Sequence, residues 1–336
     1  MQDASGVAAI AASGDEFAPR RALRYFAAVL AGALLFVGGY VGTLLAFAAR
    51  GRLPPPPIAN NVCIDEKLAF LRDHPPAAPN LLAIGSSVAW RQFDSAAVAA
   101  AIPALRPFNG AFCGLRVNQA IFVADWLLDR FDSVRNVVLV ASPYDFQSCK
   151  LTPAAAFDRK AADSFVFEGA WRWGFYLRFF DPVSLFRNVR RIAEMRTNVD
   201  PLESLVFTKF GDGPMDTDAS RAAPQYGAVS DLDRECFAVL HSFALRLKAM
   251  GRSFSVVTTP LHPDWKRRFD PDGQMRASLA RAIGASLAGT NATYWDADAA
   301  AAMDEPAFTD AIHLRWSAAS TFSRNMAEAL SHSMVQ

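Results

Sequence analysis

The longest hydrophobic stretch of the chain covers residues 25–49, YFAAVLAGALLFVGGYVGTLLAFAA, and contains no charged residue. As an α-helix it would be about 37 Å long, at about 1.5 Å per residue, which is enough to cross a bilayer with some tilt. A buried helix of a globular domain is disfavoured because the stretch has no polar face. We therefore predict a membrane-spanning helix over residues 25–49, preceded by a tail of residues 1–24.

A cleaved signal peptide is the alternative, because residues 46–48, AFA, have the small-x-small form that signal peptidase recognises. The apolar run is longer than the hydrophobic core of a signal peptide, which has about 7 to 15 residues. Arginines at positions 20, 21 and 24 precede the run, and arginines at 50 and 52 follow it. The positive-inside rule then favours a single-pass protein of the inner membrane, with a cytoplasmic N-terminus and a periplasmic C-terminal domain.

Beyond the apolar run, a proline-rich segment precedes a long region in which short apolar runs alternate with helical patterns. The segment at residues 50–60 contains four consecutive prolines, predicting a linker before a domain over residues 61–336. Predicted buried strands cover residues 80–85, 136–141, 253–259 and 292–295. Predicted helices cover residues 94–104, 116–131, 231–250, 274–287 and 316–330. This alternation predicts an α/β fold, a parallel sheet with helices on both faces, whose ligand site lies at the carboxyl ends of the strands.

Residues from about 150 to 228 interrupt this alternation and predict a helical insertion rich in aromatic residues and arginine. Two interpretations remain open. The insertion is either a cap that shapes a substrate pocket or rests its Trp/Arg face on the membrane interface, or an ordinary subdomain whose aromatic side chains fill their own core.

Charge and cysteine content narrow the class of protein. The chain has 34 Lys plus Arg against 33 Asp plus Glu, so its net charge of +1 argues against nucleic acid as a partner. The four cysteines form no C-x-x-C pair, and the histidines have no metal-spaced partners, so we predict neither a metal nor another cofactor. An oxidising compartment would make disulfides plausible. Three complete pairings are possible, and we weakly prefer Cys113 with Cys149, which flank strand-end loops.

Candidate catalytic residues lie at two distant places in the chain. Ser86 and Ser87 directly follow the predicted strand at residues 80–85, where a serine hydroxyl would face the carboxyl edge of the sheet. Either serine could instead merely cap the next helix. Asp310 precedes His313 by three residues, so one loop can present a carboxylate that orients an imidazole. The combination predicts a Ser87, His313 and Asp310 triad.

These motifs resemble those of the SGNH (GDSL-like) hydrolase superfamily, over roughly residues 80 to the C-terminus outside the insertion. Gly85-Ser86-Ser87 stands in place of the family's Gly-Asp-Ser block, with Ser87 matching the nucleophile and Ser86 departing from the family's aspartate. The Asp-x-x-His block matches Asp310 and His313. The resemblance implies a flavodoxin-like parallel sheet and is greatest to a membrane-anchored branch that includes alginate O-acetylation proteins.

The resemblance also implies an oxyanion hole. Residues 109–114, NGAFCG, match the second block and point to the amide of Gly114, beside the amide of Ser87. The third block normally supplies an asparagine, and residues 142–145, SPYD, place Tyr144 there instead. We expect the Tyr144 hydroxyl to substitute as a donor, with slower turnover if it does not.

An α/β-hydrolase is a second family to weigh, because residues 85–89, GSSVA, approximate its nucleophile elbow. In that fold the acid and the histidine come from separate loops, so the three-residue spacing of Asp310 and His313 favours the SGNH resemblance. Asp145 and His262 also follow predicted strands and are candidate substrate-binding residues. Asp145 could equally cap a helix, and His262 could be an ordinary loop residue.

These features predict a membrane-anchored, extracytoplasmic serine acyl-transfer protein, either an O-acyltransferase or a carbohydrate esterase. The family resemblance implies that its partners are an envelope polysaccharide or an acyl donor, together with a multi-spanning membrane acyltransferase. The alternative is a catalytically degenerate SGNH domain that binds glycan or scaffolds a polysaccharide modification and export complex.

Overall fold

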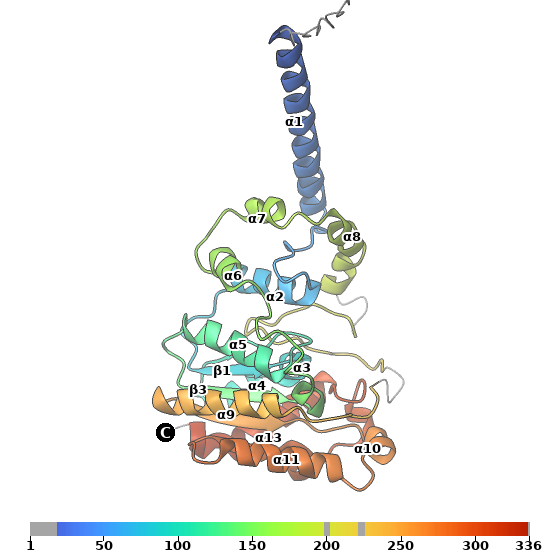
Figure 1. Ribbon diagram of the computed structural model, residues 1–336. Helices are drawn as coiled ribbons and strands as arrows, with labels where there is room; N and C mark the ends of the chain where they lie inside the picture. The colour runs from blue at the N-terminus through green and yellow to red at the C-terminus, as the bar shows by residue number, and fades with distance from the viewer. Residues whose placement is uncertain (1–18, 198–201, 221–225, 335–336) are drawn as a thin grey trace, which may run out of the picture. The chain divides into compact units, whose positions relative to one another are not determined.

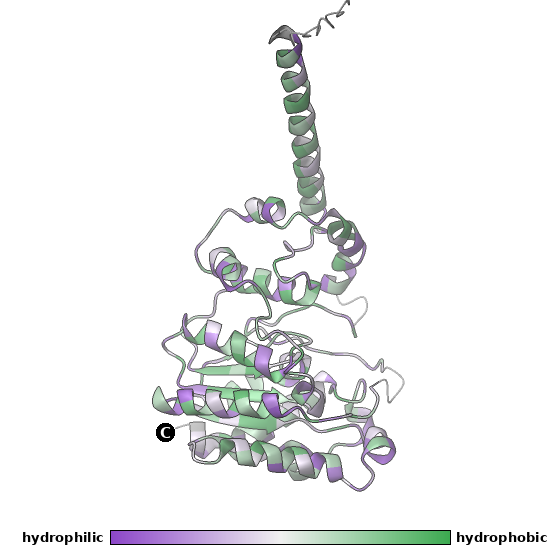
Figure 2. Ribbon diagram, in the orientation of Figure 1, coloured by the Kyte–Doolittle hydropathy of each residue, from purple (hydrophilic) through white to green (hydrophobic). Residues whose placement is uncertain are grey.

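The computed structural model describes residues 19–197, 202–220 and 226–334. The chain divides into two compact units, residues 1–53 and residues 54–336. In the first unit, helix α1 (Pro19–Ala49) includes the whole predicted apolar stretch and begins six residues before it. Figure 2 shows hydrophobic residues along most of its length. Among the described residues, α1 is the one helix long and apolar enough to cross a membrane, as a single-pass protein requires.

The second unit is built on a five-stranded parallel sheet with the order β2-β1-β3-β4-β5 (Figure 1). The strands are β1 (Leu81–Gly85), β2 (Pro107–Asn109), β3 (Asn136–Ala141), β4 (Ser253–Thr258) and β5 (Thr293–Asp296). This is the flavodoxin-like strand order, and the predicted α/β fold with a parallel sheet is confirmed. Strand β2 was not predicted, because three residues that begin with proline give no strand pattern.

Alternate residues of the central strands face two helical layers. Leu82 and Ile84 of β1 join a core that includes residues of α5 (Val117–Leu128), α9 (Arg234–Ala249) and α11 (Gln274–Leu287). Leu81 and Ala83 join a second core that includes residues of α3 (Ser87–Gln92), α4 (Ser95–Ala101) and α13 (Trp316–Met334). Both faces of the sheet are therefore covered, which explains why the strands read as continuous apolar runs rather than alternating ones.

The insertion is helical, as predicted, and several of its apolar residues join the two cores that flank the sheet. Its helices are α6 (Arg159–Val166), α7 (Arg172–Arg178) and α8 (Pro182–Thr197). Phe165 of α6 and Phe175 of α7 join the core on the α5 side of the sheet, whereas Ile192 and Met195 of α8 join the core on the α13 side. These four residues of the insertion thus extend the two cores of the domain.

Smaller elements complete the unit. They are α2 (Val62–Asp73), α10 (Pro263–Phe269), α12 (Ala297–Ala300) and the 3₁₀ turns η1 (Pro143–Phe146) and η2 (Glu305–Ala307). The proline segment belongs to this unit from Pro54 onward. Pro54, Pro55 and Pro56 are buried, and the Pro54 carbonyl accepts a hydrogen bond of 2.7 Å from Tyr176 Oη of α7. These prolines are packed structure and not an exposed spacer.

Two disulfides join Cys63 to Cys113 and Cys149 to Cys236, with Cα–Cα distances of 6.3 and 5.3 Å. The preferred pairing of Cys113 with Cys149 is therefore wrong. Cys113 lies in the loop after β2, beside the start of α2, whereas Cys149 packs in the core with Cys236 of α9. Both cysteines follow strand ends as expected, but their side chains point to different neighbours.

Candidate active site

Ser87 lies at the sharp turn between β1 and α3. This turn follows the carboxyl end of β1, which pairs with β3 at the point in the sheet where the strand order reverses. Gly85 makes this turn possible. Its φ is +143°, and a Cβ there would lie 2.2 Å from the Val140 carbonyl oxygen and 2.6 Å from the Ala89 Cβ. Only glycine fits such a close approach. Ser86 caps α3 by accepting a hydrogen bond of 3.4 Å from the Val88 amide, which leaves Ser87 as the first helical residue.

Asp310 and His313 lie in a tight loop just before α13. One oxygen of the Asp310 carboxylate accepts hydrogen bonds from the amides of Ile312 and His313, at 2.9 and 2.8 Å. The Gln92 side chain donates a bond of 2.5 Å to the Ile312 carbonyl, which ties the loop to the end of α3. The helix that begins with Ser87 thus holds the loop that carries His313.

The structure brings the three predicted triad residues into one chain of hydrogen bonds. Nε2 of His313 lies 2.9 Å from Oγ of Ser87, and Nδ1 lies 2.8 Å from Oδ2 of Asp310. Burial would raise the pKa of Asp310, but the charge and hydrogen bonds of His313 and the Ile312 amide outweigh it and hold that pKa below its usual value. An ionised Asp310 can only accept, so Nδ1 carries the proton and Nε2 is free to accept the proton of Ser87.

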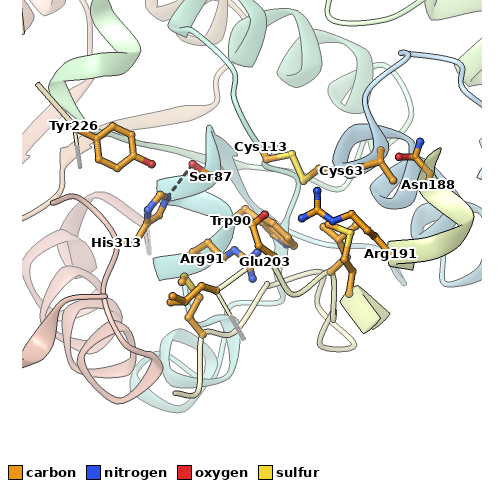
Figure 3. A pocket seen from close by; sticks show the side chains of 15 residues that line it. Cys63, Ser87, Trp90, Arg91, Cys113, Asn188, Arg191, Glu203, Tyr226 and His313 are labelled. Carbon is orange, nitrogen blue, oxygen red and sulfur yellow. Dashed lines mark hydrogen bonds between the residues drawn. A yellow bond between two sulfur atoms is a disulfide. The ribbon is translucent and has the colours of Figure 1, made fainter. Parts of the chain in front are cut away.

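Ser87 and His313 open into a cavity of about 310 Å³ (Figure 3). One wall comes from the insertion: Asn188, Arg191 and Met195 of α8. In Figure 3 the guanidinium group of Arg191 points into the cavity. The other lining residues are Val62, Cys63, Trp90, Arg91, Cys113, Leu202, Glu203, Leu205, Met215 and Tyr226. The insertion therefore shapes the pocket, as the cap interpretation expected.

The sequence reasoning missed most of this lining. Trp90 and Arg91 could have been found, because positions three and four after Ser87 lie on the same side of a helix. The wall formed by α8 and the disulfide between Cys63 and Cys113 carried no local signal, since they reach Ser87 only through the tertiary fold.

The amides of Ser87 and Gly114 are the two predicted oxyanion donors. Within the described residues, neither the Ser87 amide nor the Gly114 amide donates a hydrogen bond. Ser87 is the first residue of α3, where amides lack helical partners. Gly114 has a φ of +73° and follows Cys113, which lines the cavity. The assignment of these two amides to an oxyanion hole stays a prediction.

The expected third donor, Tyr144, is engaged elsewhere. Its hydroxyl donates a hydrogen bond to the Gly227 carbonyl and accepts one of 2.6 Å from Nε1 of Trp265. A phenol has a single proton, so the structure leaves none for an oxyanion at Ser87. The assignment of Tyr144 as an oxyanion donor is corrected accordingly: Tyr144 fastens the turn after β3 to the segment around Gly227.

Asp145 is a support beneath the site and not a substrate ligand. Its carboxylate is buried and accepts hydrogen bonds from the amide and hydroxyl of Ser142, at 2.7 and 3.2 Å. Burial raises the pKa of Asp145 to about 6, opposed by these bonds and by one from the Ser86 side chain. Asp145 therefore caps the turn after β3, which was the alternative considered for it. Through its hydrogen bond with Ser86, Asp145 also stabilises the turn that carries Ser87.

His262 also lies outside the Ser87 cavity. It borders a separate surface hollow, and its Nδ1 accepts a hydrogen bond of 3.0 Å from the Asp264 amide at the start of α10. Its own amide donates to the Ala311 carbonyl at 3.0 Å, so His262 supports the Asp310–His313 loop from behind. The structure therefore gives His262 a role in supporting this loop, and its substrate contact stays a prediction.

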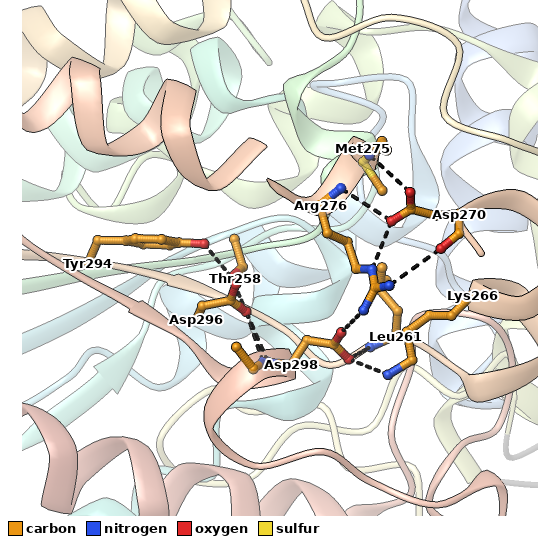
Figure 4. A network of polar contacts seen from close by, with 10 residues as sticks. Thr258, Leu261, Lys266, Asp270, Met275, Arg276, Tyr294, Asp296 and Asp298 are labelled. Carbon is orange, nitrogen blue, oxygen red and sulfur yellow. Dashed lines mark hydrogen bonds and ion pairs between the residues drawn. The ribbon is translucent and has the colours of Figure 1, made fainter. Parts of the chain in front are cut away.

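A network of ion pairs anchors the segment that contains His262 (Figure 4). Asp298 accepts hydrogen bonds from the Leu261 amide at 3.1 Å, from Nζ of Lys266 at 2.9 Å and from Arg276 at 2.9 Å. Arg276 also pairs with Asp270 at 2.8 Å. The network fixes both ends of α10 and, through His262, the rear of the Asp310–His313 loop.

Comparisons with known proteins give little further guidance. No family model matches the chain, and no curated protein matches it in sequence. Among solved structures, the chain is similar to the inhibitor-bound form of an aryl esterase from M. smegmatis, at 12% sequence identity and a TM-score of 0.41. That match covers 76% of this chain and 100% of the esterase chain.

Among the described residues, no group of three or more His, Cys, Asp or Glu could hold a metal ion.

Proposed function

We propose that this chain is a membrane-anchored, SGNH-like serine enzyme that transfers or hydrolyses O-acyl groups, most simply O-acetyl, of an envelope polysaccharide. The observation that supports the proposal is the continuous hydrogen-bond chain from Ser87 through His313 to Asp310. Such an arrangement is the usual one for a nucleophile, a general base and the group that orients the base. Its position at a cavity, on a parallel sheet edge where ligands bind, adds support.

In the first half of the reaction, Oγ of Ser87 attacks the acyl carbonyl carbon while its proton passes to Nε2 of His313. The negative charge on the former carbonyl oxygen is stabilised by the amides of Ser87 and Gly114. Asp310 stabilises the imidazolium that forms. The bond to the leaving alcohol then breaks, and that alcohol takes the proton from His313, leaving an acyl ester on Ser87.

In the second half, water or a sugar hydroxyl attacks the acyl ester and gives its proton to His313. Collapse of the tetrahedral intermediate breaks the bond to Ser87 Oγ, which takes the proton back. Water yields an esterase and a sugar hydroxyl yields a transferase, so the outcome depends on how well the cavity excludes water.

We further propose that the C-terminal domain lies outside the cytoplasm, on the periplasmic side of the inner membrane. Two disulfides suit an oxidising compartment, and α1 suits a single-pass anchor. The resemblance to alginate O-acetylation proteins suggests a multi-spanning membrane acyltransferase as the source of acyl groups.

A serine-reactive fluorophosphonate probe tests the nucleophile, using full-length protein in detergent. The wild type should be labelled and should hydrolyse p-nitrophenyl acetate. The Ser87→Ala variant should do neither. Ser86→Ala is a matched control, because Ser86 faces Asp145 and the Val88 amide and should leave Ser87 reactive. Labelling that survives Ser87→Ala would remove Ser87 from the nucleophile role.

A non-catalytic, glycan-binding scaffold is a second candidate, favoured by the engagement of the Tyr144 hydroxyl with Gly227 and Trp265. Without a third oxyanion donor, transition-state stabilisation is weaker. Absence of probe labelling in the wild type, combined with binding of an acetylated oligosaccharide, would favour this candidate. Where labelling occurs, incubation with an acetylated oligosaccharide and a free acceptor separates transfer from hydrolysis by the products formed.

A further inference from the structure

Helices α7 and α8 expose a group of large apolar side chains, which we name the α7–α8 face. It consists of Trp171, Leu177 and Val183. Trp171, Leu177 and Val183 are 67%, 42% and 66% exposed. Large apolar residues exposed within a few turns of one another along the chain are candidates for an interaction site.

Arginines surround this face. Arg187 and Arg190 are exposed, and they lie four and seven positions after Val183, so they share its side of α8. Arg178, also exposed, lies within α7, and its contact with Asp158 is a long 3.7 Å. Trp, Phe and Leu side chains bordered by arginine are typical of helices that lie in the interface of a bilayer, with cations near anionic headgroups.

A short covalent link joins the second unit to the end of α1. Five peptide steps separate Ala49, the last residue of α1, from Pro54, the first residue of the second unit. At about 3.4 Å per residue they reach at most about 17 Å. The Pro54 carbonyl is bound directly by Tyr176 of α7. If α1 spans a bilayer, α7 is therefore attached within a short reach of the bilayer surface.

We propose that the α7–α8 face docks on the headgroup layer of the bilayer that α1 spans. The apolar side chains then enter the interface, and Arg178, Arg187 and Arg190 meet anionic lipid headgroups. The same helix α8 also carries Asn188 and Arg191, which line the Ser87 cavity. A helix with its side chains is about 10 to 12 Å across, so docking holds the cavity wall within about one helix diameter of the lipid. An acyl carrier that emerges from the membrane would meet the cavity there.

The test places an environment-sensitive NBD label at position 177 of the full-length chain, through Leu177→Cys. All four native cysteines are in disulfides, so the new thiol is the only one to react. The protein is reconstituted in vesicles of phosphatidylcholine with a minority of phosphatidylglycerol. Leu245→Cys on α9 is the matched control, because Leu245 is 41% exposed and lies outside the α7–α8 face. Val183→Cys provides a second reporter should Leu177→Cys fail to fold.

Lipids brominated in their acyl chains should quench the label at 177 or 183 at least about twofold more than the label at 245, because only the former would lie in the interface. Equal quenching at both sites would overturn the proposal. A blue-shifted label at 177 without bromolipid quenching would overturn it too, since protein would then cover the face. Labelling of Ser87 by the serine probe in the same samples reports on catalysis separately, so the two proposals can fail independently.

Discussion

The ends of β1 and β3, two neighbouring parallel strands, use similar residues in opposite ways. Each strand is followed directly by a serine and then a further polar residue, Ser86 and Ser87 after β1 and Ser142 and Asp145 after β3. After β1, Gly85 permits a sharp turn that leaves the Ser87 hydroxyl in the cavity, next to His313. After β3, the chain closes into a 3₁₀ turn whose carboxylate folds back onto Ser142.

The difference teaches that a strand end determines where a residue lies but not which way its side chain points. Ser87 meets a cavity, whereas Asp145 is buried beneath the turn that carries Ser87. Tyr144, between them, points its hydroxyl toward Gly227 and Trp265. If this division is correct, substitutions after β1 should affect chemistry, and substitutions after β3 should affect stability.

The largest effect should come from Ser87→Ala. Loss of the nucleophile should lower kcat for p-nitrophenyl acetate by at least about 10³-fold, leaving only what the oxyanion amides supply. Ser86→Ala should retain activity within about tenfold, at the cost of a helix cap worth about 1 kcal/mol. Comparable losses of kcat in the two variants would mean that the turn after β1 affects activity only through its shape and that Ser87 is not the nucleophile.

The Asp310→Asn variant should show the second largest loss of activity. The amide nitrogen would donate to Nδ1 of His313, placing the ring proton on Nε2, where it can no longer accept the proton of Ser87. We expect kcat to fall by about 10² to 10⁴-fold, with little change in KM. Steady-state kinetics check this prediction, and circular dichroism checks that the loop still folds. A loss below tenfold would indicate that Asp310 does not orient the base.

Tyr144→Phe should change kcat less than about fivefold, because the hydroxyl proton is already donated to the Gly227 carbonyl. The unfolding free energy should fall by about 1 kcal/mol for the lost hydrogen bonds. Thermal unfolding and esterase kinetics on the same samples separate the two effects. A loss of about 10²-fold or more in kcat would restore Tyr144 to the oxyanion hole.

Asp145→Asn should have the smallest effect on activity but a distinct one on pH dependence. Because burial raises the native pKa of Asp145 to about 6, from 3.8, the native state binds more protons than the unfolded chain between these values. The stabilising contribution of this group is therefore full below about pH 4 and is lost as pH rises through about 6.

The Asp145→Asn variant should lose the part of the pH dependence of the unfolding free energy that Asp145 contributes. This part amounts to about 1 to 3 kcal/mol across that range. Denaturant unfolding of the full chain in detergent, stepped from acid to neutral pH, measures it. Asp132→Asn serves as the control, because Asp132 is exposed and should leave the slope unchanged. An unaltered slope in Asp145→Asn would show that Asp145 titrates alike in the folded and unfolded chain.

The sequence predicted what depends on neighbours along the chain. The apolar run at 25–49, four of the five strands and the alternation of strands with helices follow from local hydrophobic patterns, whose periods reflect backbone geometry. The three-residue spacing of Asp310 and His313 was equally local, because one short loop holds both side chains. Strand β2, three residues long, was too short to leave such a pattern.

The tertiary structure decided what depends on side-chain direction and on contacts between distant segments. It paired Cys63 with Cys113, turned Asp145 and His262 away from the cavity, and used α8 as one of the cavity walls. Each of these outcomes depends on the packing of segments that are far apart in sequence, and local propensity is the same whichever partner a side chain meets. The sequence by itself therefore determined the fold class and predicted the three residues, Ser87, Asp310 and His313, that the structure brings together, and packing decided the shape of the pocket around them.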